Sequence, residues 1–184
     1  SRLAAGTVLS GPAGGMSGGR RCAELVGIPD LVPFDMGGTS TDISLISGGQ
    51  ASLSADGMLA GQRIALRSLD IASIAAGGGS IASVDAGHTL RVGPESAGSV
   101  PGPACYGNGG TEATLSDAAC VLGYFDPSYF LGGRMRLDVP AAEVAVGRVA
   151  ATLGLGMKET AWGILSVASE SMVRLASVFT TSTF

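Results

Sequence analysis

The stretch that decides the fold is FDMGGTSTDISLI, residues 34–46. Two apolar, β-prone segments flank a Gly-Gly pair, and Asp35 and Asp42 stand on either side of that pair. Glycine allows the backbone to fold back on itself, and side chains alternate faces along a strand. The pattern therefore predicts a strand at 31–35, a tight loop of phosphate size and a second strand at 41–46, with a carboxylate at each end of the loop.

The polar groups of this loop suit a phosphate that is bound together with a metal ion. Backbone N–H groups and side-chain hydroxyls can both donate to phosphate oxygens. The N–H groups are those of Gly37, Gly38 and Thr39, and the hydroxyls are those of Thr39, Ser40 and Thr41. Asp35 and Asp42 would repel a bare phosphate, so they require a hard cation beside it, and hydrated Mg²⁺ fits. From the residues alone, a glycine turn with two solvated aspartates remains the alternative.

A second glycine-rich loop follows a strand predicted at 69–75. The chain has 30 glycines, more than twice the roughly 7% of ordinary proteins, and they fall in clusters beside apolar segments. Residues 76–80 read AGGGS, which predicts a second backbone cradle whose serine can donate a hydroxyl to a phosphate. The weaker candidates for the nucleotide or substrate side are therefore Gly77, Gly78, Gly79 and Ser80. A Walker A loop is excluded, because no GxxxxGK[ST] occurs in the sequence.

The first helix is predicted at 13–26, where apolar residues form a partial stripe before Gly27. Residues 11–19 read GPAGGMSGG, and this composition is too rich in glycine to form a helix by propensity alone. Either a ligand near the helix N-terminus or a close contact with a sheet must stabilise it. The sequence leaves both possibilities open.

The second half of the chain predicts a hairpin, a long loop and three helices. The hairpin is expected at 81–85 and 89–92, and a short helix at 114–123 is expected to be capped by Ser116 or Asp117. Asp117 could instead face a ligand, although capping is the commoner role. The long loop lies between the hairpin and this helix.

The last two predicted helices carry the clearest periodic pattern. Asp138 is expected to cap a helix at 141–153, and a second helix from Met157 has apolar residues at three- and four-residue spacing. These helices are interpreted as packing elements, and Trp162 is expected to lie in the core.

Composition excludes several classes of function. Only 14% of residues are charged, the net charge is −4, and no Lys/Arg run occurs, so nucleic acid and anionic membranes are not expected as partners. The apolar runs are too short for a membrane span, and a cytoplasmic location is expected. The three cysteines are widely spaced in the sequence, and the single histidine is His88. This spacing favours ordinary thiols over a disulfide scaffold or a zinc site.

Six motifs, in order and spacing, resemble the hydantoinase A and 5-oxoprolinase family, which includes acetone carboxylase β subunits. They are SGPAGG at 10–15, DMGGTSTD at 35–42, AGGGSIA at 76–82, VGPESAG at 92–98, PGPACYG at 101–107 and FLGG at 130–133. The hairpin is also similar to the phosphate loops of the actin-like ATPase superfamily. The resemblance implies an α/β fold with a ribonuclease H-like core, a β-rich first half with Gly-rich loops and two C-terminal packing helices.

The family implies an ATP-dependent hydrolase that acts on cyclic amides of the hydantoin or 5-oxoproline type, with ATP and Mg²⁺ as cofactors. Phosphorylation of the lactam oxygen would create an electrophile that water can attack, and Mg²⁺ would neutralise charge on the transferring group. The resemblance assigns Asp35 and Asp42 to catalysis and to the metal. It also implies a partner subunit or domain of the hydantoinase B type.

Two alternatives remain: a subunit of an ATP-dependent ketone carboxylase of the acetone carboxylase type, or a non-catalytic nucleotide-binding module. The departures from the family pattern are mild, with Ala75, Gly87-His88 and TLSDA in place of commoner residues. Family members are several hundred residues long and carry a further phosphate loop. Residues 1–184 are therefore expected to form a single or partial domain of a longer chain that does not turn over substrate alone.

Overall fold

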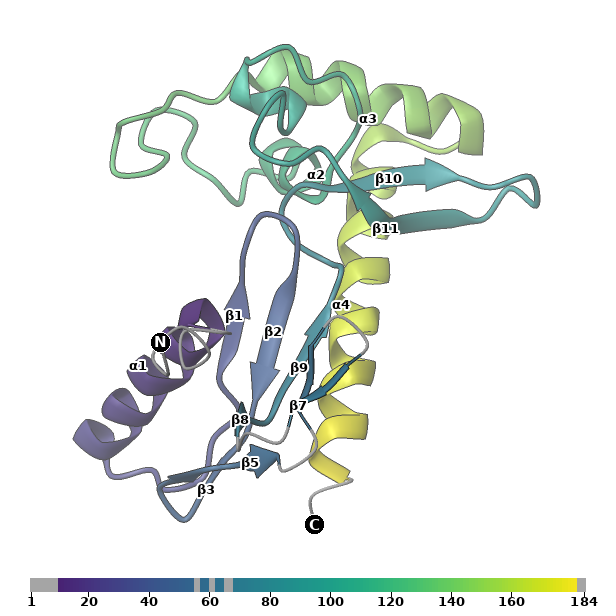
Figure 1. The fold of residues 1–184 in the computed structure, drawn as a ribbon. Helices are drawn as coiled ribbons and strands as arrows, with labels where there is room; N and C mark the ends of the chain where they lie inside the picture. The colour runs from purple at the N-terminus through teal and green to yellow at the C-terminus, as the bar shows by residue number, and fades with distance from the viewer. Residues whose placement is uncertain (1–9, 55–56, 60–61, 65–67, 182–184) are drawn as a thin grey trace. The chain divides into compact units, whose positions relative to one another are not determined.

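The computed structural model describes residues 10–54, 57–59, 62–64 and 68–181 as a mixture of helices and short strands (Figure 1). The chain forms two compact units. Of the described residues, unit 1 takes those within 10–35, 42–73 and 175–181, and unit 2 takes those within 36–41 and 74–174. The hairpin predicted at 31–46 contributes its strands mainly to unit 1 and its tip to unit 2.

Unit 1 is built from a helix and several short strands. Helix α1 (Ser10–Val26) begins three residues earlier than predicted and ends at Gly27, whose φ of 71° is left-handed. The main sheet has the order β1 (Phe34–Met36), β2 (Thr41–Ser44), β9 (Ile71–Ile74). Three two-stranded ladders pair β3 (Ile46–Ser47) with β4 (Gln50–Ala51), β5 (Leu53–Ser54) with β8 (Ser68–Leu69), and β6 (Gly57–Leu59) with β7 (Gln62–Ile64).

The glycines of α1 allow the helix backbone to lie against residues 31–35. A Cβ on Gly19 would lie 3.2 Å from Pro33 Cγ, and one on Gly15 would lie 2.8 Å from Asp35 Oδ2. These two glycines are four residues apart, so they share one face of the helix. The sequence left two explanations for the glycines of this helix, a ligand near its N-terminus or a close contact with a sheet. The close contact explains Gly15 and Gly19. The exposed Gly11, Gly14 and Gly18 meet nothing within 4 Å, and this contact does not explain them.

Unit 2 packs a β-hairpin against helices. Strand β10 (Ser80–Val84) pairs antiparallel with β11 (Leu90–Ser96), with a break in register between Ser80 and Ala82. Its helices are η2 (Ala104–Tyr106), α2 (Leu115–Val121), α3 (Val139–Leu153) and the part of α4 (Met157–Thr181) up to Arg174. Small and apolar side chains from β10, α2, α3 and α4 form the main core cluster, which includes Ala118, Val146 and Ile164. The predicted hairpin and helices of this half are confirmed.

Local polar contacts explain where these elements turn and end. In the β10–β11 turn, the Asp85 carboxylate accepts hydrogen bonds from the N–H groups of Gly87 and Thr89. The Thr89 N–H and the Arg91 side chain lower the pKa of Asp85. Helix α3 begins where the Asp138 side chain accepts a hydrogen bond from the Ala141 N–H, as the sequence predicts.

The expectation that Trp162 lies in the core is wrong. Its side chain is 58% exposed, whereas Ala161, Ile164 and Ala168 on the same helix are buried. Successive helical residues are about 100° apart, so position 162 falls outside the stripe formed by the buried positions. Hydrophobicity suggested the core, but the helical phase places Trp162 at the surface.

The cysteines are free thiols, with Cys22 exposed and Cys105 and Cys120 buried. Burial raises the pKa of Cys105, and the nearby Asp117 carboxylate raises it further. Burial also raises the pKa of Cys120. Both buried thiols therefore stay protonated at neutral pH and are poor nucleophiles.

Among the described helices, none by itself is long and apolar enough to cross a membrane. Helices α3 and α4, which meet at a bend of 90°, together have the length and apolar composition that a membrane span requires.

The expectation that Ser116 or Asp117 is the N-cap of α2 is wrong, and Asp117 instead anchors unit 2 from within the helix. The N-cap of α2 is Thr114, and Asp117 occupies the third helical position of a capping box. Its fully buried carboxylate accepts hydrogen bonds from the N–H and hydroxyl of Thr114 and from the N–H groups of Ala104 and Cys105. One side chain thus holds both the start of α2 and the middle of the long loop, where η2 begins.

We expect Asp117→Ala to lower the free energy of unfolding by about 3 kcal/mol or more, because it leaves several buried donors without an acceptor. Urea denaturation measures this change. Asp126→Ala is the control, because the Asp126 carboxylate is exposed and its hydrogen bonds come from its own turn, chiefly from Ser128. Equal losses in the two variants would contradict the anchoring role.

Candidate functional site

The register of the hairpin places Asp35 directly opposite Asp42. Leu31 and Ile46 exchange two hydrogen bonds, and the Ser44 N–H donates to the Pro33 carbonyl. Antiparallel hydrogen-bonded pairs recur every second residue, with about 5.5 Å between Cα atoms, so Asp35 and Asp42 form the next pair. The Gly37 N–H, which donates to the Ser40 carbonyl, continues the same register to the tip.

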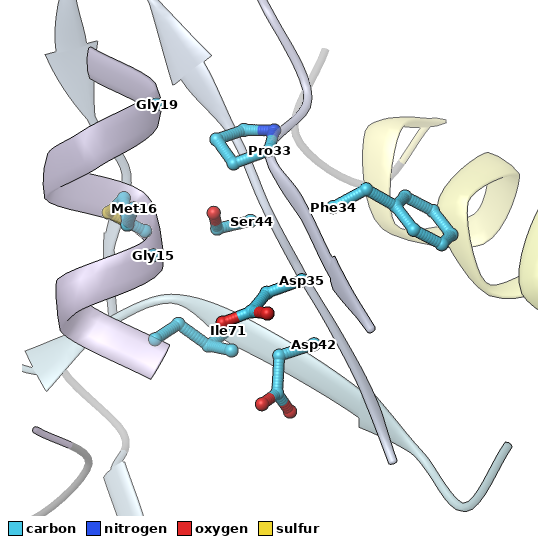
Figure 2. A pocket seen from close by; sticks show the side chains of 9 residues that line it. All are labelled: Gly15, Met16, Gly19, Pro33, Phe34, Asp35, Asp42, Ser44 and Ile71. Atoms are coloured by element: carbon cyan, nitrogen blue, oxygen red, sulfur yellow. The ribbon is translucent and has the colours of Figure 1, made fainter. Parts of the chain in front are cut away.

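The two carboxylates line a pocket in unit 1, between α1 and the sheet. The cavity volume is about 320 Å³. Figure 2 shows Asp35 and Asp42 projecting from neighbouring strands toward the same space, while Phe34 points the other way. The remaining wall comes from α1 and from β9, through residues that include Gly15, Met16 and Ile71. The predicted pair of carboxylates is therefore brought together on one face of one sheet.

Helix α1 closes this pocket against Asp35. The Gly15 position lies so close to the Asp35 carboxylate that a side chain there would displace it. Asp35 is exposed and Asp42 is partly buried. The carboxylates can therefore reach a ligand from solvent, while the helix limits where the Asp35 side chain can go.

The arrangement fits a hydrated divalent cation. Two like charges directly opposite each other on a sheet are destabilising, and a cation between them would remove that cost. Within the described residues, no group of three or more His, Cys, Asp or Glu side chains could hold a metal ion on its own. Mg²⁺ is commonly bound through one or two carboxylates plus waters and phosphate oxygens, and this donor set agrees with that mode.

The hairpin tip lies in unit 2, where the triglycine segment holds it. The N–H groups of Gly78 and Gly79 donate to the carbonyls of Gly37 and Gly38, at 3.0 and 2.6 Å. The Thr41 hydroxyl donates to the Ala76 carbonyl. The tip is therefore tied to residues 76–79 by three hydrogen bonds.

These bonds change the roles of several predicted phosphate ligands. The N–H of Gly37 is used within the hairpin, the Thr41 side chain is fully buried, and the Gly77 N–H donates to the Ser80 hydroxyl oxygen. The Ser80 N–H donates to the Gly77 carbonyl. The structure thus differs from the expected second cradle: residues 77–80 turn their N–H groups toward the protein and support the first loop.

Three residues at the centre of the tip have backbone N–H groups that could donate to a phosphate. Among the hydrogen bonds of the described residues, none uses the N–H of Gly38, Thr39 or Ser40. Gly38 and Thr39 are exposed, and Ser40 is partly exposed. Together with the hydroxyls of Thr39 and Ser40, these groups make a compact donor set of the kind that binds phosphate.

Sequence reasoning missed the contribution of α1 to the pocket and the support given by α2. The Ser116 N–H donates to the Gly78 carbonyl, which joins α2 to the triglycine segment. The four-residue spacing of Gly15 and Gly19 was a usable signal for a close helix contact. No local signal identifies the bond from Ser116 to Gly78, because it joins residues 38 positions apart.

We expect Gly77→Ala to destabilise the protein by about 2 kcal/mol, a typical cost of overpacking. A Cβ there would lie 2.7 Å from the Gly37 carbonyl oxygen and from the backbone nitrogens of Thr39 and Ser40. Gly147→Ala is the matched control, since a Cβ on that α3 residue meets nothing within 4 Å and alanine favours a helix. If Gly77→Ala proved as stable as Gly147→Ala in urea denaturation, the close contact would be refuted.

Comparison with known proteins identifies the family. Residues 1–181 match the family model described as hydantoinase/oxoprolinase, and the chain belongs to this family. It is 42% identical over 171 residues to caprolactamase subunit alpha of Pseudomonas jessenii, covering 92% of this chain and 25% of that protein. It is 40% identical over 187 residues to 5-oxoprolinase 1 of Arabidopsis thaliana, covering 91% of this chain and 14% of that protein.

The fold agrees with this assignment. A solved nucleotide-free structure of acetone carboxylase, from a study of ATP-dependent acetone carboxylation, matches with a TM-score of 0.84 at 32% identity, over 94% of this chain and 25% of that one. The mixed α/β architecture predicted from the sequence is therefore confirmed. The chain spans a quarter or less of the length of these relatives.

Proposed function

We propose that this chain supplies the phosphate and metal loop of an ATP-dependent enzyme that hydrolyses cyclic amides of the hydantoin or 5-oxoproline type. The observation that carries the proposal is the hairpin itself: Asp35 faces Asp42 on one face, and the tip has N–H groups that no hydrogen bond among the described residues uses. A magnesium ion with its waters suits the carboxylates, and phosphate oxygens suit the tip. In this proposal the hairpin is the phosphate loop of a ribonuclease H-like, actin-like ATPase fold.

Each residue has a defined task in this proposal. Asp35 and Asp42 orient the waters of Mg²⁺ or bind the ion directly, and the N–H groups of Gly38, Thr39 and Ser40 hold the terminal phosphate. Gly37, Thr41 and residues 77–80 keep the tip in position. Bound Mg-ATP supplies a phosphoryl group that makes the amide carbon electrophilic, and fixed donors around the phosphate favour its in-line transfer.

A second candidate is a subunit of an ATP-dependent ketone carboxylase, and the likeness to the acetone carboxylase structure favours it. The same loop would serve both reactions, because each begins by activating a carbonyl compound with ATP. In either case we propose that the whole protein acts with a further subunit or domain, of the hydantoinase B type for the hydrolase. A non-catalytic nucleotide-binding module is the remaining alternative. A cytoplasmic location suits ATP dependence and three free thiols.

We expect Asp35→Asn and Asp42→Asn to weaken Mg-ATP binding by roughly tenfold or more, as loss of a metal-orienting group does. Calorimetry with the full-length protein measures the affinity. Without nucleotide, either change should leave stability equal or raise it by a few tenths of a kcal/mol, because it removes a repulsion between facing charges. Opposite effects on binding and stability distinguish a ligand role from a structural one.

Asp30→Asn is the matched control for these variants. The Asp30 carboxylate is exposed in the same unit and accepts hydrogen bonds from Ser47 and Gly48, but it does not line the pocket. Its loss should leave Mg-ATP affinity unchanged. No binding by the unaltered protein, or unchanged binding by Asp35→Asn, would exclude the ATPase proposal.

We also expect Gly15→Ala to weaken Mg-ATP binding severalfold, because the new Cβ would push the Asp35 carboxylate from its place. The same change improves helix propensity by about 0.5–1 kcal/mol. Gly14→Ala gives the same gain, but its Cβ meets nothing within 4 Å, so it should not affect binding. Equal affinities for the two variants, measured by the same calorimetry, would argue against a role for α1 in placing Asp35.

A further inference from the structure

Unit 2 contains a second pocket, next to the hairpin tip and apolar in character. Its volume is about 150 Å³. The walls come from the end of β1, from α2, from Phe125 and from α4, and they include Met36, Leu115, Leu165 and Met172. None of its lining residues, all of which the structure describes, has a charged side chain, and its polar side chains are the hydroxyls of Ser116 and Ser169.

This pocket shares its wall with the tip that we propose holds phosphate. Met36 lines the pocket and is bonded to Gly37, so their Cα atoms are about 3.8 Å apart. Gly78 also lines it, and the Gly78 N–H donates to the Gly37 carbonyl. A molecule seated in the pocket would therefore have its edge within a few ångströms of the tip.

The size and lining of the pocket restrict what it can hold. An apolar cavity of about 150 Å³ accommodates a molecule the size of benzene, which corresponds to a small ring of roughly six heavy atoms. A carboxylate placed there would lose its hydration without gaining a cationic partner, which is strongly unfavourable. The pocket therefore suits a compact, uncharged molecule with one polar edge.

We propose that this pocket binds the hydrocarbon part of the substrate, so that the enzyme acts on small uncharged carbonyl compounds such as unsubstituted lactams. A ring that carries a carboxylate, such as 5-oxoproline, is disfavoured. The proposal rests on the proposed function for the phosphate loop, and it selects among the substrate classes that the family leaves open. Seating the ring against Met36 and Leu115 would direct its carbonyl oxygen toward the phosphate held at the tip.

The test is direct binding of 2-pyrrolidone and 5-oxoproline, which differ only by a carboxylate, to the full-length protein without nucleotide. Methyl-labelled methionine reports the binding by nuclear magnetic resonance. We expect 2-pyrrolidone to shift the Met36 and Met172 signals saturably and to leave Met157, outside the pocket, unchanged. 5-Oxoproline should bind at least tenfold more weakly.

A pocket variant and a matched control complete the test. Ser169 is an exposed lining residue on α4, so Ser169→Leu fills the pocket from its rim without altering the core, and 2-pyrrolidone affinity should fall at least tenfold. Ser177→Leu makes the same change at an exposed α4 position outside the pocket and should have no effect.

Equal shifts by both ligands, no shift with 2-pyrrolidone, or unchanged affinity in Ser169→Leu would overturn the inference. A pocket filled by a side chain from another part of the full-length protein would give the second of these results. Mg-ATP calorimetry on the same samples tests the phosphate loop independently. Failure of the proposed function and failure of this inference are therefore separate results.

Discussion

The backbone contact between residues 77–79 and the hairpin tip is the constraint on which the rest of unit 2 depends. It is possible only because Gly77 has no Cβ, and it lets two N–H groups bond to the carbonyls of Gly37 and Gly38. Through the bond between Ser116 and Gly78, the same segment is joined to α2, whose first turn is fixed by Asp117. A tip that would be marginally stable in an isolated hairpin is thus held by residues 76–79.

Side chains alternate along the hairpin, so that one face lines the pocket and the other face is buried. Positions 33, 35, 42 and 44 share the face that lines the pocket under α1, whereas Thr41 and Ile43 lie on the other face and are buried. A shift of one residue in register would exchange these faces. The paired hydrogen bonds of Leu31 and Ile46 fix the register far from the tip, so the carboxylates are placed by strand pairing and not by the loop.

The sequence predicts those features whose causes are local. The hairpin and the α3 cap at Asp138 each depend on residues within a few positions. Features that depend on distant partners could not be predicted in this way. The second cradle expected at 77–80 is a support, because the acceptors of Gly78 and Gly79 lie about forty residues earlier in the chain. Asp117 was expected to be the N-cap of α2, but the N-cap is Thr114, and neither this position nor the bonds of Asp117 to Ala104 and Cys105 was predicted.

Two aspartates in facing positions are unfavourable for the stability of the hairpin. A strand pair gains most from apolar or oppositely charged residues in facing positions, and two aspartates lower its stability. Helix α1 adds to this cost, because it approaches Asp35 through a glycine that weakens the helix itself. Both features reduce the stability of unit 1 in the same place. A cation bound between Asp35 and Asp42 would offset the first cost, and the space left by Gly15 would then be what allows the Asp35 carboxylate to reach it. Local instability that a ligand can relieve is typical of a binding site.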